Sequence, residues 1–282
     1  MKKLSTILIA LLLLLSAEGQ ILRYSNYTAP TPPEETPDFT DEYDTVYAAF
    51  ATKPHIDTAD IFNDFVYSLD SAGFWDRTHY LNVYCGGTNS ADALVNWRNP
   101  GTNNAVAVNS PTFTRYRGFD FSGSNQYLTT FNPYGIIAQD NATGIVYVRE
   151  DNAEAGPAYS AYDGGGNYFY LNPRNASNQV SYRTNQTADE ASTEAAWVGC
   201  WIATRRGATE IEVYRAGVSR DSGTDASSAV PNTNIYVGRH ASNYSTKETT
   251  LFMVMDGVSD AEAAALNTII ERLMDRLGIG VQ

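Results

Sequence analysis

The chain has 282 residues, enough for one substantial domain, and 12% of them are aromatic while only 18% are charged. Its formal net charge is −13 and it has no cluster of Lys and Arg, which argues against nucleic acid as a partner because phosphate binding needs such clusters. A chain rich in Tyr, Gly and small polar residues is instead typical of an extracellular or virion β-protein.

The first 19 residues have the three parts of a secretory signal. Two lysines supply the basic start, residues 7–15 are an unbroken apolar run, and small residues precede position 20. The apolar run is too short to cross a bilayer comfortably. We therefore expect a signal peptide that is cleaved before Gln20, with a retained membrane anchor over residues 1–19 as the alternative.

Residues 20–40 are predicted to be a linker. Four Pro and two Glu lie between positions 29 and 38, and this composition stays extended and buries no core.

Residues 41–78 are predicted to be a helical segment. Apolar residues recur at helical spacing over 41–50 and over 58–72, before Gly73 ends the second helix. Acidic residues at 57, 60 and 64 share one face of that helix. The helix dipole, which favours acids in the first turn, explains them better than a cation site does.

From Tyr80 the hydrophobic pattern changes to period two, and each gap carries turn-forming residues. Strands are predicted at 81–85, 113–121, 127–131, 144–148, 158–162, 168–171, 180–182, 197–204, 210–214, 235–239 and 250–257. Ser259 and Glu262 then form a capping box for a last helix, whose apolar stripe ends at Leu277. The sequence therefore predicts a mainly β fold over residues 79–282: an antiparallel β-sandwich, preceded by short helices, with a C-terminal amphipathic helix packed on a sheet.

One hairpin is predicted in detail, over residues 197–214, with its turn at Arg206-Gly207. The apolar side chains expected to share one face of it are Val198, Cys200, Ile202, Ile211 and Val213.

Three stretches resemble the concanavalin A-like and laminin-G-like jelly-roll superfamily. Gly118–Leu128 reads as a strand, a glycine turn and a Tyr-containing strand. Trp197–Val218 is a hairpin that begins with Trp and ends in Tyr-x-x-Gly, and in Met253–Leu266 a strand runs into a helix. The resemblance implies a jelly-roll arrangement of the sandwich.

More narrowly, residues 41–277 resemble uncharacterised structural proteins of phages that infect Bacteroidetes. The similarity lies in Ser71–Asp76, Asn96–Pro100 and Val108–Thr114. It implies a virion or secreted surface role and supplies no catalytic residues. The signal-like start departs from this pattern, because virion proteins normally assemble in the cytoplasm, and it favours a secreted protein or a virion with a membrane.

The two cysteines, Cys85 and Cys200, both fall in strand-like runs. They either form one disulfide or lie as two separate small apolar side chains, and the sequence leaves both open. Only His79 lies near either of them in sequence, so no zinc ligand set is present.

A catalytic role finds little support. His55, His79 and His240 are scattered, and the pattern Gly-x-Ser-x-Gly is absent. Jelly-roll glucanases place acids on one strand face, and Glu210 and Glu212 come nearest, but no third acid follows them. An exposed polar strand face explains this pair better, and we expect no enzyme.

Sugar recognition is the stronger prediction, because it uses aromatic faces together with amide and carboxylate hydrogen bonds. Two loops offer such side chains: Tyr162, Asp163, Asn167 and Tyr168 in one, and Arg239, His240, Asn243 and Tyr244 in the other. In a simpler interpretation, Tyr162 and Tyr168 only pair across a hairpin whose turn the glycines make. No cofactor is expected. Calcium in the first loop is the alternative, and it would need more oxygen ligands than one Asp supplies.

We therefore predict a non-enzymatic phage virion protein with a structural or attachment role, such as a spike, fibre or capsid-surface component, with glycan binding as an additional role. The alternative is a secreted bacterial lectin-like carbohydrate-binding module. Expected partners are other virion or cell-surface proteins, a glycan and further copies of the chain, with a membrane contact only through residues 1–19. The predicted location is the virion or the cell exterior.

Overall fold

The structure is a computed structural model that describes residues 38–281. In this range the helices are α2 (Asp41–Ala49), α3 (Ile56–Ser71) and α4 (Asp260–Arg276), with short 3-10 turns η1 (Tyr84–Gly86) and η2 (Asp92–Leu94). None of these described helices is both long and apolar enough to cross a membrane. The predicted signal peptide or anchor and nearly all of the predicted linker lie outside the described residues.

Two large antiparallel sheets make up most of the described chain, which confirms the predicted antiparallel sandwich. Sheet A has the order β13-β12-β11-β6-β17-β4-β3, with β1 also paired to β17. Its strands are β1 (Thr78–Val83), β3 (Thr112–Thr114), β4 (Gly118–Asp120), β6 (Ala142–Val148), β11 (Gly199–Gly207), β12 (Glu210–Arg215), β13 (Val218–Gly223) and β17 (Glu248–Met255).

Sheet B has the order β10-β9-β8-β7-β14-β5-β2. Its strands are β2 (Val106–Val108), β5 (Tyr127–Thr129), β7 (Tyr159–Tyr162), β8 (Tyr168–Asn172), β9 (Val180–Gln186), β10 (Glu190–Ser192) and β14 (Tyr236–Val237). A separate small hairpin pairs β15 (Arg239–His240) with β16 (Asn243–Tyr244).

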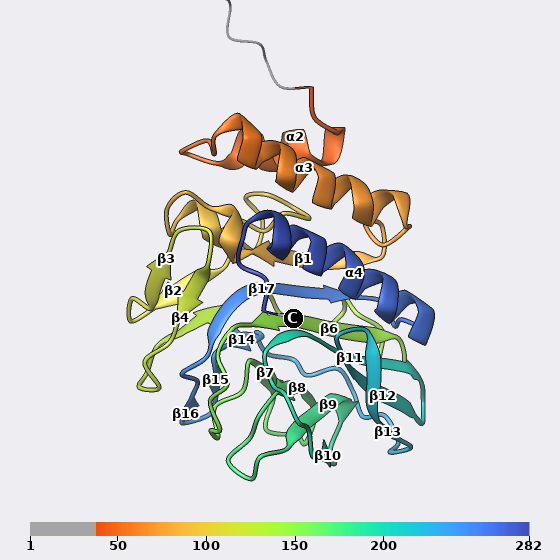
Figure 1. The fold of residues 1–282 in the computed structure, drawn as a ribbon. Coiled ribbons are helices and arrows are strands. Elements are labelled where there is room, and N and C mark those ends of the chain that lie inside the picture. Colours follow the sequence, from red (N-terminus) through yellow and green to blue (C-terminus); the bar gives the residue numbers. More distant parts are fainter. Residues whose placement is uncertain (1–37, 282) are drawn as a thin grey trace, which may run out of the picture. The chain divides into compact units, whose positions relative to one another are not determined.

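The described chain is built in three layers, with the helices on one side, sheet A in the middle and sheet B on the other side (Figure 1). One apolar cluster lies between the helices and sheet A, and a second lies between the two sheets. In β17, Leu251, Met253 and Met255 belong to the helix-side cluster, whereas Phe252 and Val254 belong to the cluster between the sheets. Every residue of β17 is buried, because this strand packs on both faces.

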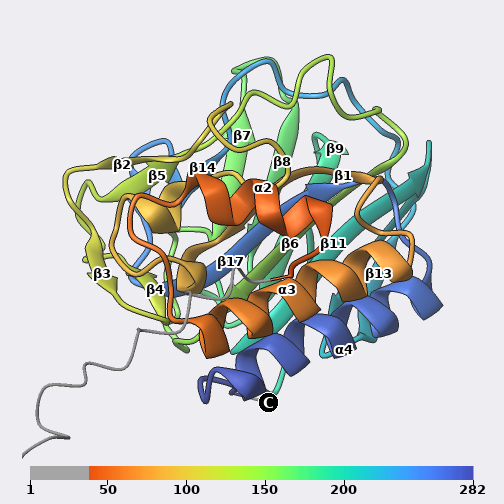
Figure 2. The ribbon, with the colours of Figure 1, turned by 90° about the horizontal axis from the view of Figure 1, so that it is seen from above.

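The helices cover the outer face of sheet A, with α3 and α4 side by side (Figure 2). The capping box predicted at Ser259 and Glu262 is present and begins α4. The apolar stripe of α4 packs into the helix-side cluster, so the predicted C-terminal amphipathic helix on a sheet is confirmed.

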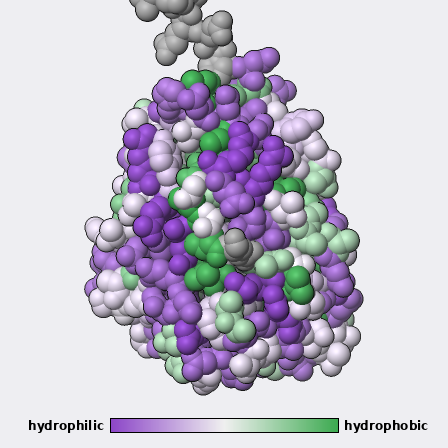
Figure 3. Space-filling model, in the orientation of Figure 1, coloured by the Kyte–Doolittle hydropathy of each residue, from purple (hydrophilic) through white to green (hydrophobic). Residues whose placement is uncertain are grey.

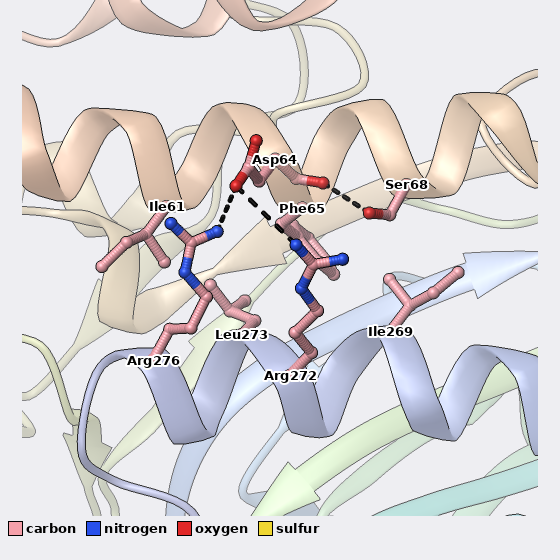
Figure 4. A pocket seen from close by; sticks show the side chains of 8 residues that line it. All are labelled: Ile61, Asp64, Phe65, Ser68, Ile269, Arg272, Leu273 and Arg276. Atoms are coloured by element: carbon pink, nitrogen blue, oxygen red, sulfur yellow. Dashed lines mark hydrogen bonds and ion pairs between the residues drawn. The ribbon is translucent and has the colours of Figure 1, made fainter.

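Asp64 of α3 joins that helix to α4. Its carboxylate bonds Arg276, and Nη2 of Arg272 lies 3.9 Å from the same oxygen (Figure 4). The hollow between the two helices has a volume of about 10 Å³, room for about one water molecule. The Asp64 carboxylate therefore serves as an interhelical ion-pair partner.

The facing predicted for the hairpin of β11 and β12 is wrong. Cys200 and Ile202 face the helices, whereas Ile211 and Val213 lie between the two sheets. Strand β11 has apolar residues on both faces, so its alternation does not identify which set pairs with β12. The turn also comes later than predicted, because β11 continues through Gly207.

The two cysteines are not joined by a disulfide. Both lie in the helix-side cluster, so the structure shows the second of the two alternatives, two separate buried side chains. Burial raises the pKa of the Cys85 thiol to about 12 and also raises the pKa of the Cys200 thiol.

Candidate functional site on the outer face of sheet B

The outer face of sheet B carries a row of tyrosines. Side chains alternate along a strand, and in β8 Phe169 and Leu171 point into the cluster between the sheets. Tyr168 and Tyr170 therefore point outward, as does Tyr162 at the end of β7, which pairs with Tyr168. The first predicted loop thus lies at one end of an outward-facing strip of rings.

The small hairpin β15–β16, which holds the second predicted loop, is fixed against β7. Ser160 Oγ donates to the Arg239 carbonyl over 2.6 Å, and the Gly238 N–H donates to the Ala158 carbonyl, just before β7, over 2.9 Å. The Ser245 N–H donates to the Gly238 carbonyl over 2.8 Å and closes the hairpin. Gly238 has a φ of +82°, and a Cβ there would lie 3.0 Å from the Phe121 ring. Glycine is needed at this position because the chain turns left-handed in a narrow space.

The hairpin brings His240 onto the first loop. Tyr162 and Tyr168 stack with their ring centroids 4.3 Å apart and their planes 13° from parallel, and the His240 ring lies 5.8 Å from each of them. Tyr170 contacts His240 at 5.6 Å, and the Arg183 guanidinium lies 4.1 Å from the centre of the Tyr168 ring. These five residues are called the stacked-tyrosine cluster below.

A second group of rings surrounds Arg239. Its guanidinium carbon lies 4.6 Å from the ring centre of Tyr127, 5.0 Å from that of Tyr236 and 5.8 Å from that of Tyr244. Its Nε donates to the Ala241 carbonyl over 3.0 Å. Arg239 and these three tyrosines are called the arginine cage below.

The two groups adjoin each other. Arg239 and His240 are consecutive in β15, and Tyr236 pairs with Ser160, two residues before Tyr162. The stacked-tyrosine cluster and the arginine cage therefore form one surface, called the aromatic face below, to which strands β5, β7, β8, β9 and β14 and the hairpin contribute.

Burial and charge on the aromatic face are uneven. Tyr162 is 38% exposed, while most of the other rings are half-buried. Burial and the nearby Arg183 lower the pKa of His240, although Asp189 opposes this, so its imidazole is neutral at neutral pH. Arg183 is itself paired with Asp189, with Nε and Oδ1 3.3 Å apart.

Of the eight predicted ligand-binding residues, five lie in the aromatic face: Tyr162, Tyr168, Arg239, His240 and Tyr244. Asp163 and Asn167 instead close the loop between β7 and β8, since Asp163 accepts from the Gly165 N–H over 2.9 Å and from the Asn167 amide over 2.8 Å. Asn243 is exposed in the hairpin.

Sequence reasoning missed four members of the aromatic face, namely Tyr127, Tyr170, Arg183 and Tyr236. All four come from strands rather than loops. The period-two pattern places Tyr170 on the same face as Tyr168, so this signal was present in the sequence.

Other surfaces of the described chain have fewer side chains that a ligand could contact. A cleft of about 310 Å³ is lined by acids, Arg98, Trp75 and Trp97, but the two tryptophans are 3% and 1% exposed and have little ring surface for a ligand. Within residues 38–281, no three His, Cys, Asp or Glu residues come together as metal ligands.

Exposed apolar side chains form no dominant patch on the face drawn in Figure 3, which is mostly hydrophilic with a narrow apolar band. The large ones exposed in the described residues come from helix α3, from three different strands and from the loop before β6: Ile56, Tyr67, Val106, Tyr134, Ile136, Tyr162 and Val218. Single exposed apolar side chains need no functional explanation.

The glucanase-like pair also has a structural role. Glu212 is 7% exposed, so the predicted exposed strand face is wrong for it. Its Oε2 lies 2.6 Å from Nη2 of Arg206, and Glu210 lies 3.0 Å from Nε of the same arginine. Arg206 also bonds Asp260 at the start of α4 over 2.7 Å. The two glutamates are therefore held in an ion-pair network between β12 and α4.

No protein-family model and no curated protein matches the chain. Solved structures do share its fold. The sialidase of Trypanosoma rangeli in complex with sialic acid superposes with a TM-score of 0.51 at 12% identity, covering 80% of this chain and 39% of the sialidase. The botulinum neurotoxin serotype D binding domain superposes with a TM-score of 0.50 at 12% identity, covering 70% of this chain and 52% of that domain. The chain thus spans about two fifths of the length of the sialidase and about half of that of the neurotoxin domain. At this level of identity the similarity shows a shared fold alone.

Proposed function

We propose that the protein is a non-enzymatic carbohydrate-binding protein whose ligand lies on the aromatic face. The observation that carries this proposal is the meeting of the two loops that sequence reasoning had flagged separately. His240 from one lies 5.8 Å from Tyr162 and Tyr168 of the other. Sugars present apolar C–H faces that pack on aromatic rings, and hydroxyls that bond side-chain donors and acceptors.

The rings of the aromatic face suit this role because they are already in place. Tyr162 and Tyr168 hold each other by stacking, His240 contacts both rings, and Arg183 lies over Tyr168. Few rotamers are left to freeze when a ligand arrives, so little of the binding energy is lost to ordering. Tyr162 is the most exposed ring of the aromatic face, so it is the first ring that a ligand meets.

The simpler interpretation, in which Tyr162 and Tyr168 only pair across their hairpin, accounts for their stacking. It does not account for the docking of β15–β16 on them, which adds the His240 imidazole to the same surface.

The carboxylates support a non-enzymatic role. A glycosidase needs two carboxyl groups that flank the scissile bond. On the aromatic face, the Asp163 carboxylate is used within its own loop and Asp189 pairs with Arg183. Glu210 and Glu212 are held by Arg206 on the opposite side of sheet A from sheet B.

For the setting, we propose a phage virion, in which the protein acts as a structural or attachment component. The resemblance to phage structural proteins supports this setting, and a secreted lectin-like module is the alternative. The binding domain of the neurotoxin and the sialidase bound to sialic acid share the sandwich, which agrees with either setting at the level of fold. Stoichiometric copies of the chain in purified particles would support the virion, whereas free protein that begins at Gln20 in culture medium would support secretion.

A glycan array tests the binding proposal. Wild-type protein should bind a subset of glycans, and Tyr162→Ala and Tyr244→Ala should each lose most of that signal. Tyr67→Ala is the matched control, because Tyr67 is also exposed, at 57%, but lies on α3 among the helices. An array without signal for wild-type protein, or equal losses in all three variants, would contradict the proposal.

A further inference from the structure

Arg239 is an arginine whose charge has no counterpart in its surroundings. Within residues 38–281, no carboxylate forms an ion pair with it, and the only hydrogen bond of its guanidinium joins Nε to the Ala241 carbonyl. The two terminal nitrogens therefore keep four N–H groups without an acceptor from the described part of the chain. Arg183, the other arginine of the aromatic face, is paired with Asp189.

The arginine cage holds this guanidinium in place. Three tyrosine rings lie within 5.8 Å of its central carbon, and the backbone on both sides is tied down by Ser160 and by the Gly238 carbonyl. Ring faces attract a cation and orient it, but they do not neutralise its charge. A planar guanidinium fixed in this way is prepared for two parallel hydrogen bonds to an oxyanion.

The negative net charge of the chain also affects whether an anion can approach Arg239. With a formal net charge of −13, the protein repels anions at long range. At about 0.15 M salt that repulsion is screened beyond about 8 Å, so an anion at the aromatic face would be governed by its immediate neighbours. Those neighbours are Arg239, the Arg183–Asp189 pair and Asp163, whose carboxylate accepts hydrogen bonds within its own loop.

From these contacts we infer that the aromatic face selects acidic glycans, with Arg239 binding a carboxylate or sulfate group while a sugar ring packs on the stacked-tyrosine cluster. This inference rests on the proposed function and adds the chemical class of the ligand. Carboxylate and sulfate share the chemistry that a guanidinium recognises, namely negative oxygens spaced for paired N–H donors.

Paired probes test the inference by isothermal titration at about 0.15 M salt. The pairs are sialyllactose with lactose, oligogalacturonate with its methyl ester, and 6-sulfated with unsulfated N-acetyllactosamine. At least one acidic probe should bind wild-type protein about ten- to a hundredfold more tightly than its neutral partner, as expected for a hydrogen-bonded charge pair. The pair that shows the preference distinguishes carboxylate from sulfate.

Variants locate the preference. Arg239→Gln should bring the ratio of acidic to neutral affinity close to one, and this ratio is the measured quantity because Arg239 belongs to the binding surface itself. Arg239→Lys should retain part of the ratio. Arg115→Gln is the matched control, because Arg115 also lies over a tyrosine, with its guanidinium carbon 4.5 Å from the Tyr116 ring centre, but in the turn between β3 and β4 of sheet A. Thermal unfolding of each variant shows whether its fold is intact.

The outcomes separate the two proposals. Equal binding of acidic and neutral probes by wild-type protein, or an undiminished preference in Arg239→Gln, would overturn the inference and leave glycan binding standing. Binding of none of the six probes would overturn the inference, whereas the wider glycan array decides the proposed function independently.

Discussion

The ammonium group of Lys247 lies 2.7 Å from Oε1 of Glu154, and the lysine side chain is only 1% exposed. The same carboxylate accepts from the Thr246 N–H and from the Ser245 hydroxyl. Burial lowers the pKa of Lys247, and the Glu154 carboxylate opposes that shift. This buried pair ties the segment after β16 to the loop after β6, and so fixes the exit of the hairpin that carries Arg239 and His240.

Removing one partner of this pair should be costly. In Lys247→Met the Glu154 carboxylate stays buried without its cation, and we expect a loss of about 3–5 kcal/mol in the free energy of unfolding. The double variant Glu154→Gln/Lys247→Met should recover part of that loss, because no isolated charge remains. Urea unfolding of the wild-type protein, both single variants and the double variant measures both quantities, and additive losses would show that the pair is not coupled.

The hairpin also depends on a glycine that allows close approach. A Cβ on Gly156 would lie 2.2 Å from the carbonyl carbon and oxygen of Tyr244, so Gly156→Ala must displace β16. We expect a loss of about 1–3 kcal/mol in stability, as for overpacked sites, together with weaker glycan binding on the array. Gly207→Ala is the control, since its new Cβ would meet nothing closer than 3.6 Å. Equal behaviour of the two variants would contradict the placement of the hairpin.

The state of the cysteines can be measured directly. Because Cys85 and Cys200 are buried thiols with raised pKa values, neither should react with a thiol reagent such as Ellman's reagent while the protein is folded. Two thiols per chain should react after denaturation without reductant. A count of zero after denaturation would indicate a disulfide and would contradict the arrangement of the helix-side cluster.

Sequence reasoning found the elements that carry a strong periodic signal. The apolar stripe and capping box of α4 are local, so both could be read without tertiary information. Strand β13 had no such signal, because its sequence, Val-Ser-Arg-Asp-Ser-Gly, is polar and mostly exposed at the edge of sheet A. The facing of β11 was missed for the opposite reason, since both of its faces are apolar.

The candidate site was predictable only in part, because some of its contacts are local in sequence and others join distant strands. Tyr162 and Tyr168 are close in sequence, so a hairpin between them was a local inference. The contact of His240 with that pair depends on β14 pairing with β7, which joins segments more than seventy residues apart. No local pattern encodes that pairing, and Tyr236 and Tyr127 looked like ordinary strand residues until the register placed them around Arg239.

His240 should make stability depend on pH. Burial and Arg183 hold its pKa in the folded protein below the ordinary value of 6.5. As pH falls below 6.5 the unfolded chain therefore binds a proton that the folded protein does not, and the free energy of unfolding decreases. Replacing the imidazole in His240→Asn should remove this contribution, which urea unfolding at several pH values between 5 and 7.5 measures. An unchanged pH dependence would show that the imidazole is not held neutral in the folded protein.

Glu271 of α4 should make stability depend on pH in the direction opposite to His240. Burial raises its pKa to about 6, and Asp275 adds to the shift, while the Tyr147 hydroxyl and Arg215 oppose it. Between the ordinary value of 4.5 and about 6, the folded protein keeps a proton that the unfolded chain has lost, so stability falls as pH rises through this interval. Glu271→Gln removes the titration and can still accept from the Tyr147 hydroxyl, so the stability advantage of this variant over wild-type protein should grow from pH 4.5 to 6 and then stay constant.

Glu262→Gln on the same helix is the contrast, because Ser259 and Arg77 outweigh burial and lower the pKa of Glu262. The Glu262 carboxylate stabilises the fold at higher pH. The free energy of unfolding of Glu262→Gln should therefore fall relative to that of wild-type protein as pH rises. If the stability of both variants relative to wild-type protein changed in the same direction with pH, the pKa values of the two glutamates would not be shifted in opposite directions, and the prediction would be wrong.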